Sequence, residues 1–393
     1  MRHLPESDLF AAQLGDSERD AWLERAAYAV TRLGSAKNPY VGNKKKILID
    51  FADIMYQHGL HEVIDGGRVL DVFSGSAYVS YLFKHLGAAV WSNDMLSSAF
   101  LNSVSLIDSE SCVDRSRFDI LCKDHGRKFP HRIIKEGYVP RRFAEYEADW
   151  LDRFRCNIEH DFGGTVVDII KHIEDTTPLS SFGKAVVLSE ELDKRNAYAQ
   201  YLASVVLYVT SKTFVGGRLN CGQVLAELEH RIQHVRNRGN TISFNRIPMI
   251  GRAAHSNGLQ SVSTHANVFD LFDKYNPQVD IIYLDPPYGG EQSNYAKMYK
   301  FFEFWLGQEE RPEGADCFTM SKNYEENFNN LLSILPTEPI WVLSYNESSW
   351  ANIDKIVGCV SEFKKDVKIE QIVYRYNYRK VRDSGIEYVV MAS

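Results

Sequence analysis

The sequence predicts an α/β protein with a mainly parallel sheet, and three segments carry this prediction. Residues 281–284 are four apolar or aromatic residues without charge, typical of a strand covered on both faces. Residues 68–94 read as a strand, a small-residue turn, a helix and a second strand, and residues 339–346 form another apolar strand with a polar end. Open α/β sheets bind ligands at the carboxyl ends of their strands, so the polar residues there are candidate site residues.

Composition sets broad bounds. The 393 residues are long enough for one large α/β domain and a smaller inserted or appended one, and a content of 44% hydrophobic and 25% charged residues is ordinary for a soluble protein. No apolar run is long enough for a membrane span, and the acidic start lacks a signal core, which predicts a cytoplasmic protein. Six scattered cysteines without a Cys-x-x-Cys pair predict neither disulfides nor a metal site. The net charge of −7 argues against nucleic acid, yet residues 231–252 hold five arginines and no acid.

A nucleotide-type turn follows the strand that begins at Arg68. It contains Asp71, Phe73 and Gly75, and the next strand ends in Asp94. The separation of Asp71 and Asp94 is close to the ~20 residues expected between such a turn and a carboxylate that holds ribose hydroxyls. We therefore expect Asp94 to bind the ribose of an adenosyl cofactor.

The strand at 281–284 leads into Asp285-Pro286-Pro287-Tyr288. The two prolines cannot extend a sheet and stiffen the backbone, so a carboxylate, a bare carbonyl and an aromatic ring are held together. The amino group of a nucleobase is a poor nucleophile because its lone pair is delocalised into the ring. Asp285 and the Pro286 carbonyl can hold its two protons while Tyr288 stacks on the base, which stabilises the charge that develops on nitrogen.

The Asp-Pro-Pro-Tyr tetrad resembles the catalytic motif of amino-group DNA methyltransferases. Tyr40-Val-Gly-Asn-Lys44 resembles the first cofactor motif of Dam-type adenine methyltransferases, in which the aromatic residue borders the cofactor and the lysine lies near the active site. The turn at Asp71 is similar to the methyltransferase pattern Asp-x-Phe-x-Gly-x-Gly, with Ala77 in place of the second glycine. The strand that ends in Asn346 resembles the strand that closes the target-base pocket in the same family.

The order of these motifs resembles that of the Dam-like (D12-class) DNA adenine-N6 methyltransferases. The resemblance implies a Rossmann-like class I methyltransferase sheet with a mostly helical inserted target-recognition domain. It further implies S-adenosyl-L-methionine as cofactor and a flipped adenine of double-stranded DNA as substrate, because the amino group is buried in the duplex. The expected division is an N-terminal helical segment (1–36, with a helix that Ser17 caps), a cofactor-binding half (37–109), the insertion (110–260) and a catalytic half (261–393).

Further residues are assigned from position and chemistry. Asn267 follows a short strand, and its amide can pair with the cofactor's adenine. Tyr295 lies in a polar segment after Tyr288 and is expected either to hold the target base or to fill the space that the base leaves. Asn346 is expected to contact the target base. DNA phosphates are expected to contact a basic stretch near the end of the insertion. Its arginines are Arg231, Arg236, Arg238 and Arg246.

Other assignments remain open from sequence alone. A related enzyme could act on RNA or on cytosine N4, although Asp285 favours adenine because the cytosine enzymes usually carry serine there. A catalytically inactive nucleic-acid-binding relative is a second alternative, against which the intact tetrad argues. A cognate restriction endonuclease is a candidate partner, whereas the recognition sequence and the oligomeric state cannot be read from the chain.

Overall fold

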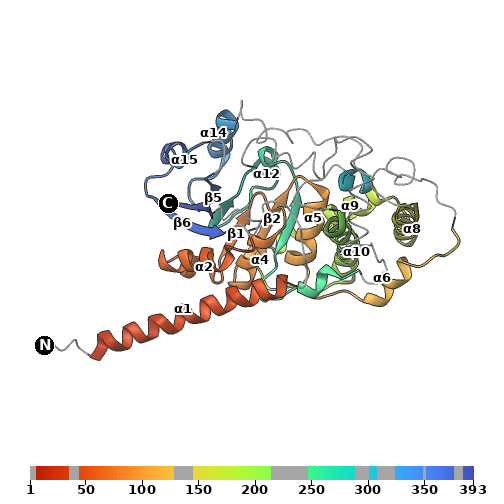
Figure 1. Ribbon diagram of the computed structural model, residues 1–393, viewed down its shortest axis with the longest axis horizontal. Coiled ribbons are helices and arrows are strands. Elements are labelled where there is room, and N and C mark those ends of the chain that lie inside the picture. Colours follow the sequence, from red (N-terminus) through yellow and green to blue (C-terminus); the bar gives the residue numbers. More distant parts are fainter. Residues whose placement is uncertain are drawn as a thin grey trace.

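The computed structural model describes residues 6–34, 44–127, 145–213, 247–287, 301–307, 324–347, 351–375 and 384–393. These residues contain a seven-stranded sheet with the order β3-β2-β1-β4-β5-β7-β6, flanked by helices (Figure 1). Strands β1 to β5 pair in parallel, and β7 is antiparallel to both β5 and β6. The strands are β1 (Arg68–Asp71), β2 (Ala89–Asp94), β3 (Val262–His265), β4 (Ile281–Leu284), β5 (Ile340–Asn346), β6 (Val367–Arg375) and β7 (Ser384–Ala392).

Helices cover both faces of the sheet, as the uninterrupted apolar strands predict. Along β4, Ile281 and Tyr283 pack into the core on one face, and Ile282 and Leu284 pack into the core on the other. The first face is covered by α1 (Glu6–Leu33), α2 (Leu48–Gln57), α4 (Tyr78–His85) and α5 (Ser97–Ser103). The second face is covered by α12 (Val268–Tyr275), α14 (Tyr324–Ile334) and α15 (Ile353–Ser361). The α/β class with a mostly parallel sheet is therefore confirmed.

The chain between β2 and β3 is mainly helical where it is described. Its side chains join the core beneath α4 and α5, and α10 packs against α5 beside the sheet (Figure 1). Its longer elements are η1 (Val104–Asp108), α6 (Arg115–Leu121), α8 (Glu145–Phe162), α9 (Val166–Asp175) and α10 (Glu190–Thr213). The same region also contains η2 (Leu179–Ser181) and η4 (Ile250–Ala253), whereas the short helix α3 (His61–Ile64) precedes β1.

The predicted start of the first helix is wrong. Helix α1 begins at Glu6, so Ser17 lies inside it and caps nothing. Ser17 is exposed, and a serine that faces solvent costs a helix little, so a capping residue type does not by itself mark an end. No helix in the described ranges is long and apolar enough to span a membrane.

Candidate active site

Four predicted residues meet at one edge of the sheet. Asp71, Asp94 and Asn346 end β1, β2 and β5, and Asp285 follows the last residue of β4. These strands run in parallel, so their carboxyl ends share an edge. The Asp285 side chain is 19% exposed, so solvent reaches part of this edge.

Asp94 ties the turn after β1 to the end of β2. The backbone N–H of Gly75 donates to its Oδ2 (2.8 Å), and the N–H of Leu96 donates to its Oδ1 (2.9 Å). Each carboxylate oxygen has two lone pairs, so both can accept a further hydrogen bond. Burial raises the pKa of Asp94 to about 6, against the pull of these two N–H groups. The group is thus placed and charged at neutral pH to receive hydroxyl donors.

The same turn explains the usual glycine at position 77. Ala77 has φ 59° and ψ 19°, the left-handed conformation, and it immediately precedes α4. A residue with a Cβ pays about 1–2 kcal/mol for this conformation, whereas glycine does not. Ala77 adopts this strained conformation with the smallest side chain that has a Cβ.

Asp71 presents a buried and incompletely bonded carboxylate. Ser80 donates to its Oδ2 (2.6 Å), while Oδ1 is buried and lacks a hydrogen-bond partner among the described residues. Burial raises the pKa of Asp71 to about 7, and the nearby charges of Asp285 and Asp94 add to the rise. A buried oxygen of this kind is a place where a cationic ligand group is stabilised.

Lys44 joins two carboxylates at this edge. Its Nζ lies 3.1 Å from Asp285 Oδ1 and donates a short hydrogen bond to Glu387 Oε1. Burial by itself lowers the pKa of Lys44, but the charges of Asp285 and Glu387 raise it above its ordinary value. The lysine is therefore charged, and two carboxyl groups share it.

Glu387 extends this cluster to β5 and β6. Asn346 Nδ2 lies 3.3 Å from Glu387 Oε2 and donates to the Tyr374 hydroxyl at 2.7 Å. The amide group of Asn346 is thus engaged with protein partners at the position where it was expected to contact the base.

Sequence reasoning missed Glu387. Strand β7 is antiparallel, and Glu387 in its first half pairs with Asn346 at the last position of β5, so it reaches the edge formed by the carboxyl ends of the parallel strands. The available signal was a single acid within the apolar run 386–392, because a charge buried in a strand needs a partner.

Other predicted residues are placed as follows. Pro286 is buried and Pro287 is partly exposed, next to Asp285. Phe73 packs against the core on the α12 side. The side-chain Oδ1 of Asn267 accepts from the backbone N–H of Phe269 (3.1 Å) and caps α12. Several assigned residues lie outside the described residues: Tyr40, Tyr288, Tyr295, Arg231, Arg236, Arg238 and Arg246.

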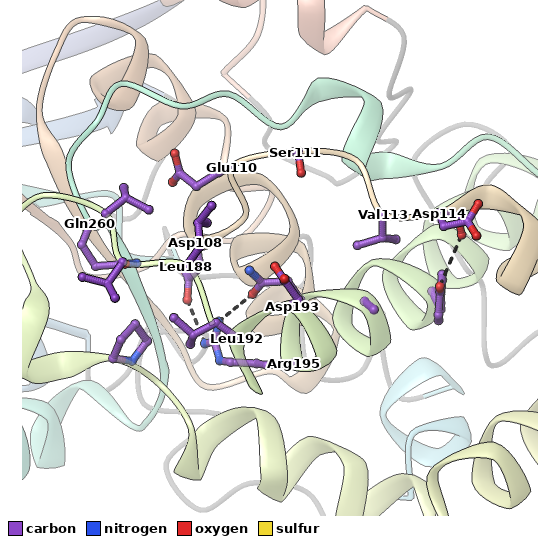
Figure 2. A pocket seen from close by; sticks show the side chains of 16 residues that line it. Asp108, Glu110, Ser111, Val113, Asp114, Leu188, Leu192, Asp193, Arg195 and Gln260 are labelled. Atoms are coloured by element: carbon purple, nitrogen blue, oxygen red, sulfur yellow. Dashed lines mark hydrogen bonds and ion pairs between the residues drawn. The ribbon is translucent and has the colours of Figure 1, made fainter. Parts of the chain in front are cut away.

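A cavity of about 390 Å³ lies elsewhere, between η1, the start of α10 and the residues before β3 (Figure 2). None of the site residues assigned above lines it. Its floor includes the ion pair of Arg195 with Asp108 (2.8 Å), which Figure 2 marks with a dashed line. This cavity is separate from the carboxyl edge that gathers the predicted residues.

Comparison with known proteins finds similarity to DNA methyltransferases. A family model for the D12 class N6 adenine-specific DNA methyltransferases matches residues 40–136. The chain is 23% identical over 344 residues to the type II methyltransferase M2.HphI of Haemophilus parahaemolyticus, covering 86% of this chain and 91% of the relative. It is 24% identical over 353 residues to the modification methylase StsI of Streptococcus sanguinis, covering 86% of this chain and 48% of the relative. The chain is thus similar to the D12 class of N6 adenine-specific DNA methyltransferases over residues 40–136, and to these two methylases over most of its length.

Proposed function

We propose that this edge transfers a methyl group from S-adenosyl-L-methionine to the N6 amino group of an adenine flipped out of duplex DNA. The observation that carries the proposal is Asp285, a partly exposed carboxylate held by Lys44 beside the two carboxylates of the turn. A charged acceptor at an open edge suits a reaction in which positive charge develops on an amine.

The residues of the turn fit the proposed cofactor. The unpartnered Oδ1 of Asp71 suits its ammonium group, and the free lone pairs of Asp94 suit its ribose hydroxyls. Gly75, at φ 48°, lets the backbone approach closely. When bound, S-adenosylmethionine supplies a methyl group on a positively charged sulfur. Phe73, Tyr40 and Asn267 complete the proposed cofactor contacts.

The proposed substrate contacts come from the Asp-Pro-Pro-Tyr turn. Asp285 and the Pro286 carbonyl accept the two N–H groups of the amine, and Pro287 keeps that carbonyl in place. Held in this way, the nitrogen lone pair points away from the ring plane, and the growing charge is stabilised more than the ground state. Tyr288 stacks on the base, while Tyr295 and Asn346 border its pocket.

The proposed DNA-binding region is the insertion at 110–260, between the cofactor-binding half at 37–109 and the catalytic half at 261–393. Its arginines neutralise phosphates, which positions the protein without reading sequence. One relative is named a type II methyltransferase and the other a modification methylase. We therefore propose a role beside a cognate restriction endonuclease, which this methylation would prevent from cutting.

Methylation of mixed-sequence duplex DNA with a methyl-labelled cofactor tests the proposal. After digestion to nucleosides, label in N6-methyldeoxyadenosine is the expected result. Label in N4-methyldeoxycytidine, or label in RNA but not in DNA, would overturn the proposed substrate. Arg236→Ala combined with Arg238→Ala is expected to weaken DNA binding and to reduce its salt dependence by about two phosphate contacts.

A further inference from the structure

Glu387 is a charged side chain on β7 for which the methyl-transfer scheme above has no use. Its side chain is only 3% exposed, so its charge needs compensation within the protein. The compensation comes from Lys44, whose Nζ also lies 3.1 Å from Asp285. One buried cation is thus shared between the proposed catalytic carboxylate and a second carboxylate on an antiparallel strand.

We propose that Glu387 is a positioning residue for methyl transfer, which acts through Lys44 on the charge and orientation of Asp285. The inference rests on the function proposed above and assigns Glu387 a role in that same site. Glu387 contacts Lys44 and Asn346.

The charge count explains why a second carboxylate is useful. A lysine paired with Asp285 alone would give a neutral pair, and its proton would compete with the substrate amine for the carboxylate oxygens. Glu387 takes a share of the ammonium group, so Lys44 compensates Asp285 only in part. The uncompensated part of the Asp285 charge stabilises the amine as it becomes positive.

Strand pairing and a hydrogen bond hold the Glu387 side chain beside Lys44. It pairs with Asn346 across β5 and with Ile372 across β6, so both neighbours hold its backbone in the sheet. Its Oε2 lies 3.3 Å from the amide Nδ2 of Asn346, which in turn donates to the Tyr374 hydroxyl. The carboxylate is consequently oriented toward Lys44 by groups on two other strands.

The charged and titratable groups that face Asp285 come from several elements. Lys44 precedes α2, Asp71 ends β1, Tyr283 lies in β4, Tyr324 begins α14 and Glu387 lies in β7. Burial raises the pKa of both tyrosines well above the ordinary value, so they stay neutral. Asp71 belongs to the proposed cofactor site, so the experiment uses saturating cofactor and DNA.

The test compares kcat against pH for wild type, Glu387→Gln and Lys44→Met. Removing Glu387 leaves the lysine to Asp285, so the acid limb of kcat should move to lower pH while the plateau falls at least about tenfold. Removing the lysine should move the acid limb to higher pH. The KM for the cofactor should stay within threefold of wild type in Glu387→Gln, because Glu387 acts on the charge of Asp285 and not on cofactor binding. Glu370→Gln, on β6 and bonded to His58, is the matched control and should leave the profile unchanged.

Opposite shifts of the two acid limbs would support the proposal, because a merely structural role moves neither. The proposal would be overturned if the acid limb of Glu387→Gln does not move, or if it moves to higher pH as that of Lys44→Met does. If Glu387→Gln fails to fold, the double variant Lys44→Met/Glu387→Gln is compared with Lys44→Met. Because Glu387 acts through Lys44, identical acid limbs in these two variants support the role, and an acid limb that the loss of Glu387 still moves in the absence of the lysine overturns it. A wild-type protein that methylates no adenine would instead contradict the proposed function itself.

Discussion

Two buried ionic clusters in this protein differ in how completely they are closed. Asp108 and Arg195 are 1% and 0% exposed and lie 2.8 Å apart. Asp108 also accepts from the N–H and hydroxyl of Ser263, and Arg195 donates to Ile173 and Thr177, so this pair links α9 and α10 to β3. Among the described residues, the Lys44 cluster joins two carboxyl groups to one cation, and its Asp285 side chain is partly exposed.

The difference indicates that the Asp108–Arg195 pair serves the stability of the fold and the Lys44 cluster serves the reaction. A balanced pair whose hydrogen bonds are satisfied inside the protein holds two elements together and has nothing left for a ligand. An unbalanced cluster at the edge of a sheet retains charge that a substrate can use. We therefore expect the first cluster to govern stability and the second to govern turnover.

The largest expected effect on stability comes from breaking the closed pair. Asp108→Asn leaves Arg195 buried with an uncompensated charge, and the free energy of unfolding should fall by about 3–5 kcal/mol. Urea denaturation measures this change. Disrupting the exposed pair of Arg25 and Asp65 (3.1 Å apart) with Asp65→Asn is the control and should cost no more than about 1 kcal/mol. Equal costs for the two variants would remove the distinction between a closed buried pair and a surface pair.

The next effect concerns the cofactor. Asp94→Ala removes the acceptor that we assign to the ribose hydroxyls, and calorimetry should show a cofactor Kd raised about 10–100-fold. Asp280→Ala is the matched control, because Asp280 also accepts a backbone N–H (from Arg68, 2.8 Å) but lies before β4, at the opposite edge. A Kd unchanged by Asp94→Ala would refute the ribose assignment.

A smaller effect should appear when pH is varied. The raised pKa values of Asp71 (about 7) and Asp94 (about 6) mean that both are partly protonated in mildly acidic solution without cofactor. Cofactor binding favours the ionised forms, so affinity should rise on the order of tenfold from pH 6 to pH 8 and then level off. Asp71→Asn should remove the part of this rise near pH 7. An affinity that is constant with pH, or that falls, would show that neither carboxylate contacts the cofactor.

The smallest effect belongs to the turn. Ala77→Gly removes the left-handed strain but increases the freedom of the unfolded chain, so the unfolding free energy should change by less than about 1 kcal/mol. Ala77→Val should destabilise by more than that, because a β-branched residue is poorly accommodated at positive φ. Thermal denaturation of both variants would reveal the order, and a valine variant as stable as the glycine variant would contradict the conformational argument.

Most of the fold could be predicted because its strands are local and apolar. The segments at 68–71, 89–94, 281–284 and 340–346 carry enough buried side chains to be recognised without partners. Their parallel order then followed from the alternation of strands and helices. The prediction that Ser17 caps the first helix was wrong, since one exposed polar residue cannot decide where α1 begins.

The candidate site was predictable only in part. Asp71, Asp94 and Asp285 follow strands, and that position alone brings them to one edge. Glu387 could not be placed in this way, because its position depends on β7 running antiparallel beside β5. The Asp108–Arg195 pair was missed for a related reason: its partners are far apart in the chain and meet only through tertiary packing.

The most direct test of the distinction is Asp285→Asn, which keeps the shape of the side chain and removes its charge. Single-turnover methyl transfer to adenine should fall at least about 1,000-fold, because the acceptor that stabilises the developing charge is lost. Cofactor affinity should remain within threefold of wild type and stability within about 1 kcal/mol, since Lys44 keeps its partner Glu387. A variant that still transfers methyl groups within tenfold of the wild-type rate would contradict the account.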